Sequence, residues 1–135
     1  MSSESPARDL VADRLDRLVA GYNAEDAEAI VALFAEHGRF VDIDGTVHSG
    51  RDSILRDHLE RFARSPGSWF EVERVGIDGA IAVATWLRHR AADGSGTHAA
   101  WRGVDVIEFD GDGLIVVKST YAKSAAPAYE QVPDR

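Results

Sequence analysis

The C-terminal half of the chain contains four segments that alternate between apolar and polar residues. They cover residues 69–77, 80–90, 97–109 and 114–123, and a period of two is typical of β-strands. Asp and Gly, which favour tight turns, occur in all three intervening gaps. Strands joined by short connections pair with their sequence neighbours in antiparallel fashion. This half therefore predicts an antiparallel meander.

The N-terminal half predicts three helices and a short hairpin. Apolar residues recur at helical spacing over residues 6–23, a second, shorter helix has an inner stripe that ends at Phe34, and a third helix runs over 49–64. Residues 38–48 predict two short strands joined by Asp44-Gly45. Helices followed by a meander give an α+β fold. We expect a curved, mainly antiparallel sheet wrapped around the helices, with an internal pocket.

A chain of 135 residues can bury one core but is short for two domains. We predict a single domain over residues 8–124. Residues 1–7 and 125–135 are rich in Ser, Ala and Pro, and they predict a flexible N-terminus and a flexible C-terminal tail.

Composition narrows the possible partners. The formal charge of −8 argues against nucleic acid and anionic membranes, because both favour basic surfaces. Without cysteine there is no disulfide, thiolate nucleophile or cysteine-based zinc site. The N-terminus lacks a signal-peptide pattern and no segment is apolar enough to span a bilayer, so we expect a cytoplasmic protein.

Two aspartates occupy positions where apolar residues are expected. Asp105 shares a strand face with Trp101 and Ile107, and Asp42 lies on the same side as Phe40. An apolar environment raises the pKa of a carboxyl group and favours acid–base chemistry. If both face one cavity, they form an acid–base site. Alternatively, Asp105 pairs with a buried arginine or a backbone donor, and Asp42 lies on an outer edge.

Several segments resemble the NTF2-like superfamily, specifically its SnoaL-like and ketosteroid-isomerase-like small proteins. The segments are residues 22–35 with 40–42, residues 48–54, and residues 103–109 with 112–115 and Tyr121. The resemblance covers roughly residues 8–124 and implies an NTF2-like cone.

The resemblance also implies roles for individual residues. Asp42 matches the general base of ketosteroid isomerase, and Asp105 matches the aspartate of its oxyanion hole. That enzyme is a well-known example of pKa tuning, because an apolar environment keeps its oxyanion-hole aspartate protonated. Leu18 replaces the family's tyrosine, and Tyr22, one helical turn further on, is a possible substitute. The implied reaction is proton transfer, by isomerisation or cyclisation, on a hydrophobic carbonyl compound, without cofactor or metal.

The same resemblance allows two alternatives to this function. A non-catalytic small-molecule-binding or assembly module is the main alternative, because the tyrosine is missing. An epoxide hydrolase or dehydratase is a weaker one, because Gly103 replaces the arginine of the Arg-x-Asp motif and Thr120 replaces the final aspartate of the related epoxide hydrolases.

Alternation along the strands and apolar spacing along the helices predict the remaining site residues. His89 is a possible polar support at the cavity mouth, although an exposed position at the strand end is the simpler interpretation. Trp86 is expected on the outer sheet face, where a homodimer partner would cover it. The predicted pocket walls are Phe34, Phe40, Phe62, Val83, Leu87, Trp101, Ile107 and Phe109.

Overall fold

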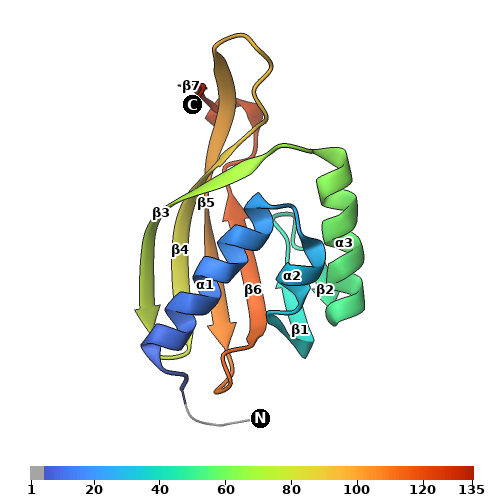
Figure 1. The fold of residues 1–135 in the computed structure, drawn as a ribbon, viewed down its shortest axis with the longest axis vertical. Helices are drawn as coiled ribbons and strands as arrows, with labels where there is room; N and C mark the ends of the chain where they lie inside the picture. Colours follow the sequence, from blue (N-terminus) through green and yellow to red (C-terminus); the bar gives the residue numbers. More distant parts are fainter. Residues whose placement is uncertain (1–4) are drawn as a thin grey trace.

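The helices lie on one side of a curved sheet, with α1 crossing the sheet and α3 standing beside β1 and β2 (Figure 1). The computed structural model describes residues 5–135. The elements in chain order are α1 (Arg8–Asn23), α2 (Ala27–Val31), β1 (Phe34–Val41), β2 (Val47–Ser49), α3 (Arg51–Arg64), β3 (Trp69–Asp78), β4 (Ile81–His89), β5 (Thr97–Phe109), β6 (Ile115–Ala122), η1 (Ala126–Ala128) and β7 (Glu130–Pro133). No helix within residues 5–135 is long and apolar enough to cross a membrane.

The sheet confirms the predicted meander and the α+β class. Its strand order is β2-β1-β6-β5-β4-β3, and β7 pairs with β5 outside this path. All pairs are antiparallel except β1 and β6, which are parallel. The parallel pair brings the N-terminal hairpin beside the last long strand, so residues far apart in sequence share one concave face.

The second helix is shorter than predicted. Helix α2 ends at Val31, and Phe34 is the first residue of β1 rather than the last position of a helical stripe. Phe34 pairs with Ile115 of β6, and the Ile115 N–H donates to the Leu33 carbonyl over 2.9 Å. This long-range pairing overrides the local helical spacing.

The C-terminal residues differ from the predicted flexible tail. Residues 130–133 form β7, which pairs with the start of β5. Glu130 accepts a hydrogen bond from Arg102 at 2.8 Å, and Asp134 lies 2.7 Å from the His98 ring. Of the predicted flexible N-terminus, residues 1–4 lie outside the described residues.

The core lies between α1 and the concave face of the sheet. Val11, Leu15 and Leu18 on α1 pack in one buried cluster with Ile107 and Ile115. Burying each such side chain contributes about 1.5–3 kcal/mol. This packing fixes α1 across the sheet and positions the residues of its C-terminal turn over the functional site.

Candidate functional site

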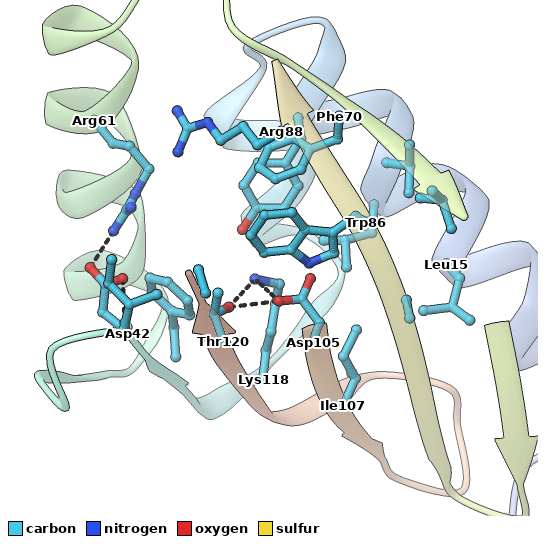
Figure 2. Close-up of a pocket in the computed structure, with 18 of the residues that line it drawn as sticks. Leu15, Asp42, Arg61, Phe70, Trp86, Arg88, Asp105, Ile107, Lys118 and Thr120 are labelled. Carbon is cyan, nitrogen blue, oxygen red and sulfur yellow. Dashed lines mark hydrogen bonds and ion pairs between the residues drawn. The ribbon is translucent and has the colours of Figure 1, made fainter. Parts of the chain in front are cut away.

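A cavity of about 270 Å³ opens between α1, α3 and the concave face of the sheet. Its volume lies near the lower end of the range for small-molecule pockets. Most of its walls are apolar, but polar and charged side chains also line it, several of which are labelled in Figure 2. They are Asp16, Tyr22, Asp42, Arg61, Arg88, Asp105, Lys118, Thr120 and Ser124.

Asp105 is held at the cavity wall by two residues of β6. The register places Asp105 opposite Thr120, and Lys118 lies two residues earlier on the same face. The Thr120 hydroxyl donates to Asp105 Oδ1 at 2.7 Å, and Lys118 Nζ donates to Thr120 Oγ1 at 3.1 Å. Lys118 Nζ lies 3.6 Å from Asp105 Oδ1 (Figure 2).

Lys118 is almost completely buried, with 3% of its surface exposed. Burial alone would lower the pKa of Lys118, but the Asp105 carboxylate and then the Tyr22 oxygen outweigh burial and hold it above its ordinary value. The side chain is therefore an ammonium at neutral pH. Asp105 and Lys118 form a fixed pair of opposite charges in an apolar wall.

Tyr22 does point into the cavity, one turn after Leu18, but its proton is already engaged. The His58 Nδ1–H donates to the Ile54 carbonyl at 2.8 Å, so the unprotonated Nε2 accepts from the Tyr22 hydroxyl at 2.7 Å. Burial is the main cause that lowers the pKa of His58 to about 4, which keeps the ring neutral. Burial likewise raises the pKa of Tyr22. The Tyr22 oxygen therefore presents lone pairs, rather than a proton, to the cavity.

Asp42 lies one residue beyond β1 and is an ion-pair partner. Arg61 of α3 donates to Asp42 Oδ2 at 2.6 Å, and the Ile43 N–H donates to Asp42 Oδ1 at 2.7 Å. Partial burial raises the pKa of Asp42, but the hydrogen bond from Arg61, its charge and the Ile43 N–H together outweigh burial, so the net effect is a lowered pKa. The expected raised pKa is therefore wrong for Asp42, because Arg61 lies directly against its carboxylate.

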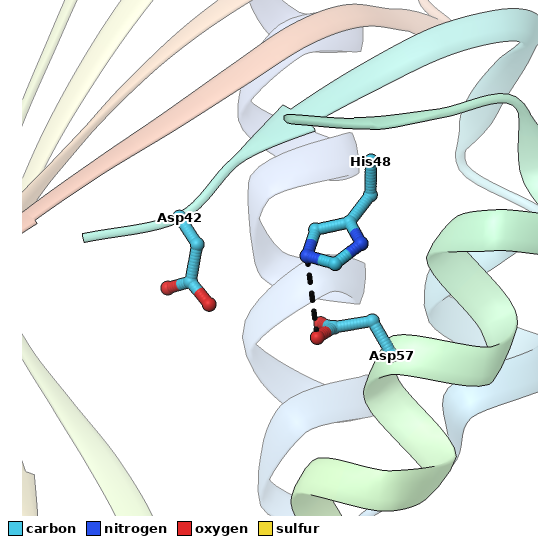
Figure 3. Close-up of side chains that lie close together, drawn as sticks. All are labelled: Asp42, His48 and Asp57. Atoms are coloured by element: carbon cyan, nitrogen blue, oxygen red, sulfur yellow. Dashed lines mark ion pairs between the residues drawn. The ribbon is translucent and has the colours of Figure 1, made fainter. Parts of the chain in front are cut away.

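Three side chains near this ion pair have the chemistry of metal ligands. One donor atom each from Asp42, His48 and Asp57 lies within 4.8 Å of the other two (Figure 3). Arg61 Nη2, however, lies 2.6 Å from Asp42 and 3.0 Å from Asp57. The guanidinium already supplies the positive charge that these carboxylates require, so a cation would have to displace Arg61. The residues do not form a preorganised metal site.

The faces of β4 are the reverse of the prediction. Ala84 pairs with Asp105 and Trp86 with Gly103, and directly paired residues lie on the same face of a sheet. Trp86 therefore faces the cavity rather than the outside. A Cβ on Gly103 would lie 2.2 Å from the Trp86 ring, so the glycine provides the space that the indole fills.

Four of the eight predicted wall residues line the cavity, and the reversal of β4 accounts for the absence of Val83 and Leu87. Phe40, Phe62, Trp101 and Ile107 line the cavity, whereas Phe34 and Phe109 are buried in the core beside it. Val83 and Leu87 lie on the opposite side of β4, and Val83 is 38% exposed.

His89 lies neither at the cavity mouth nor in solvent. It is on the same side of β4 as Val83 and is buried. Its ring contacts His98 at 2.7 Å and Glu71 at 3.0 Å, and it stacks on Trp69 with 3.7 Å between centroids. His89 thus belongs to a separate cluster, outside the cavity, that links neighbouring ends of β3, β4 and β5 through contacts with Trp69, Glu71 and His98.

Three cations in the cavity were not among the predicted site residues. Arg61, Arg88 and Lys118 each line it. Lys118 and Arg88 had a usable signal, because each is a charged residue within a strand that is otherwise largely apolar. Arg61 had none, since a basic residue in the last turn of a helix is commonplace.

A family model described as the SnoaL-like domain matches residues 15–118. The chain belongs to the SnoaL-like family. This confirms the resemblance to the NTF2-like superfamily. None of the curated proteins matches the chain.

Solved structures show the same fold. A proposed SnoaL-like polyketide cyclase from Jannaschia sp. CCS1 is 18% identical with a TM-score of 0.75, over 91% of this chain and 92% of that chain. An NTF2-like protein of unknown function from Mesorhizobium loti is 26% identical with a TM-score of 0.70, over 86% and 93%. A protein with a ketosteroid-isomerase-like fold from Catenulispora acidiphila, in complex with trimethylamine, is 18% identical with a TM-score of 0.72, over 81% and 84%.

Proposed function

We propose that this SnoaL-like protein is a cofactor-independent enzyme that transfers a proton on a hydrophobic carbonyl compound, by isomerisation or cyclisation. The observation that carries the proposal is Asp105, a carboxylate fixed by Thr120 and Lys118 in a mainly apolar cavity. A carboxylate positioned in this way can remove a proton from the carbon next to a carbonyl group.

The neighbouring cation suits the second half of that step. When Asp105 takes the proton, the C–H electron pair moves into the C–C bond and negative charge develops on the carbonyl oxygen. Lys118 has three N–H groups and gives one to Thr120, which leaves donors for that oxygen. Asp105 then returns the proton to a different carbon, or the enolate carbon attacks a second carbonyl carbon within the same molecule and the alkoxide that forms takes the proton from Asp105.

The proposal assigns the base to Asp105 rather than to Asp42. The sequence resemblance implied the reverse order, with Asp42 as base and Asp105 as donor to the oxyanion. Arg61 donates directly to Asp42 at 2.6 Å and makes it a weaker base. Lys118 Nζ, by contrast, lies 3.6 Å from Asp105, beyond direct hydrogen-bond distance. Asp105 accepts its hydrogen bond from Thr120, which suits a carboxylate rather than a protonated donor. We propose that Asp42 holds Arg61 at the cavity wall.

The test uses 2-tetralone, a small apolar ketone with exchangeable protons next to its carbonyl group. We expect the protein to accelerate exchange of these protons for deuterium, followed by proton NMR in D2O. Asp105→Asn should lower the protein-dependent rate by about 100-fold or more, since a positioned base typically contributes that much. The proposal would be contradicted if the wild-type protein exchanged the protons of 2-tetralone, and of a panel of related ketones, no faster than buffer alone.

A non-catalytic binding module remains the second candidate. The observation that favours it is that Asp42 is paired with Arg61 and the Tyr22 proton with His58, so two of the polar groups are already satisfied. Saturable binding of apolar ketones without any proton exchange would support this alternative.

A further inference from the structure

Arg88 is the one cavity cation for which the described part of the chain provides no ion-pair partner. Arg61 is held by Asp42 and Asp57, and Lys118 lies beside Asp105. Within residues 5–135 no carboxylate forms an ion pair with Arg88, and its Nε is buried without a hydrogen-bond partner. The Arg88 side chain is half-buried and its buried Nε lacks an acceptor, which is costly, so this part of the cavity favours an anion.

The guanidinium is held in place by aromatic rings. Its Cζ lies 5.3 Å from the centre of the Phe70 ring and 5.5 Å from the centre of the Trp101 ring. Aromatic faces position an arginine and leave its N–H edge free for a bidentate acceptor. In Figure 2 the Arg88 side chain extends from β4 towards the side of the cavity where Arg61 lies, with no interaction drawn to another residue.

A second unused donor lies on the same strand face. Trp86 precedes Arg88 by two residues and lines the same cavity, and its indole Nε1 is also buried without a partner. Both donors line the cavity and require oxygen acceptors, which an apolar hydrocarbon lacks.

We propose that Arg88 binds a carboxylate, so that the preferred ligand of the cavity is a hydrophobic carbonyl compound that also carries a carboxylate group. The inference rests on the proposed function in that it uses the same cavity, with Asp105 at the reacting end of the ligand. Ala84 is opposite Asp105, and Arg88 lies four residues further along β4. That is about 13 Å of strand. A carboxylate at Arg88 would thus anchor the ligand away from the reacting carbon.

A permanent anion fits this site better than a transient one. Burial, and then the charge of Arg61, lower the pKa of Arg88, which shows that its surroundings oppose the positive charge when no anion is present. An enolate forms only briefly, whereas a ligand carboxylate would compensate the guanidinium for as long as it is bound. Arginine and carboxylate also match in shape, through two parallel N–H···O bonds.

The test compares two probes of nearly equal shape by isothermal titration calorimetry at pH 7. We expect 2-naphthoate to bind the wild-type protein at least about 10-fold more tightly than 2-naphthamide, because hydrogen bonds between charged groups are the stronger ones. Arg88→Met should lower the affinity for 2-naphthoate by at least about 10-fold and so remove this preference. Arg74→Met, at an exposed position on the neighbouring β3, is the matched control and should retain the preference.

Three results would overturn the inference: equal affinity of the wild-type protein for the two probes, an unchanged preference in Arg88→Met, or no binding of either probe at about 1 mM. Folding is monitored separately by thermal unfolding, where Arg88→Met should be at least as stable as the wild type because it removes a half-buried cation that has no ion-pair partner among the described residues. Asp105→Asn distinguishes the two proposals. If this variant still exchanges 2-tetralone protons while the naphthoate preference depends on Arg88, the proposed function is wrong and the anion site stands.

Discussion

At the scale of single residues, the cavity works through pairs of groups that set one another's charge. Lys118 remains charged because Asp105 is near, and His58 remains neutral because it is buried. Tyr22 then donates to His58 and presents its oxygen to the ammonium. One substitution therefore alters more than one group.

Replacing Lys118 tests this dependence. Lys118→Met leaves the Asp105 carboxylate in an apolar wall without its cation, and we expect a loss of about 2 kcal/mol in the free energy of unfolding at pH 7. Because the folded-state pKa of Lys118 is raised, its contribution is fully present below the ordinary value of 10.5 and is lost as pH rises through the folded-state pKa. Urea unfolding measures the loss, and Lys123→Met, exposed just beyond the same strand, should have little effect.

His58 predicts a loss of stability at acidic pH, in contrast to the loss at alkaline pH that Lys118 predicts. The unfolded chain binds a proton near pH 6.5, whereas the folded ring takes it only near pH 4, so stability falls as the pH is lowered through that window. The full difference corresponds to about 3 kcal/mol. Between pH 7 and 4 the wild type should lose more stability than His58→Gln by up to this amount. Parallel pH profiles of the two proteins would contradict the neutral, buried histidine.

At the scale of elements, the sequence predicted β5 correctly and β4 incorrectly, for a physical reason. In β5 one phase of the alternation holds Trp101, Asp105 and Ile107, and this phase does line the cavity. In β4 both phases are apolar, so the alternation alone does not distinguish inside from outside. The pairing of Trp86 with Gly103 decides it, because only a glycine leaves room for the indole.

That pairing predicts the effect of Gly103→Ala. The new methyl group would lie 2.2 Å from the Trp86 ring and 2.7 Å from the Tyr121 carbonyl oxygen, so the indole must move into the cavity. We expect a loss of about 1–3 kcal/mol in stability, measured by thermal unfolding, and a changed tryptophan fluorescence spectrum. Gly76→Ala in β3 is the matched control, because a Cβ there meets no atom within 4 Å. Equal behaviour of the two variants would contradict the close packing.

At the scale of the whole molecule, the fold could be predicted from the order of its elements, but the site could only be predicted in part. Helices followed by an antiparallel meander, with the segments around Asp42 and Asp105, gave the family. The partners of those aspartates could not be predicted, because Arg61 reaches Asp42 from a separate helix and Lys118 reaches Asp105 from the neighbouring strand. Arg61 leaves no pattern in the local sequence, and the position of Lys118 in a largely apolar strand does not show which carboxylate it meets.

The homodimer also stays a prediction at this scale. The outer sheet face lacks Trp86, but Val83 and Val106 are paired across β4 and β5 and each is 38% exposed, with Tyr121 on β6 60% exposed. We expect association through this face, measured by sedimentation velocity at micromolar concentration. Val83→Lys should weaken it, whereas Val47→Lys on β2 should not. A monomeric wild-type protein would contradict the predicted homodimer.

The central claim is that the cavity carboxylate beside Lys118, and not the one beside Arg61, moves the proton. The most direct measurement is the rate of deuterium exchange into 2-tetralone for Asp105→Asn and Asp42→Asn, side by side with the wild type. We predict a loss of about 100-fold or more for Asp105→Asn and of less than about 10-fold for Asp42→Asn. A larger loss in Asp42→Asn than in Asp105→Asn would contradict the claim.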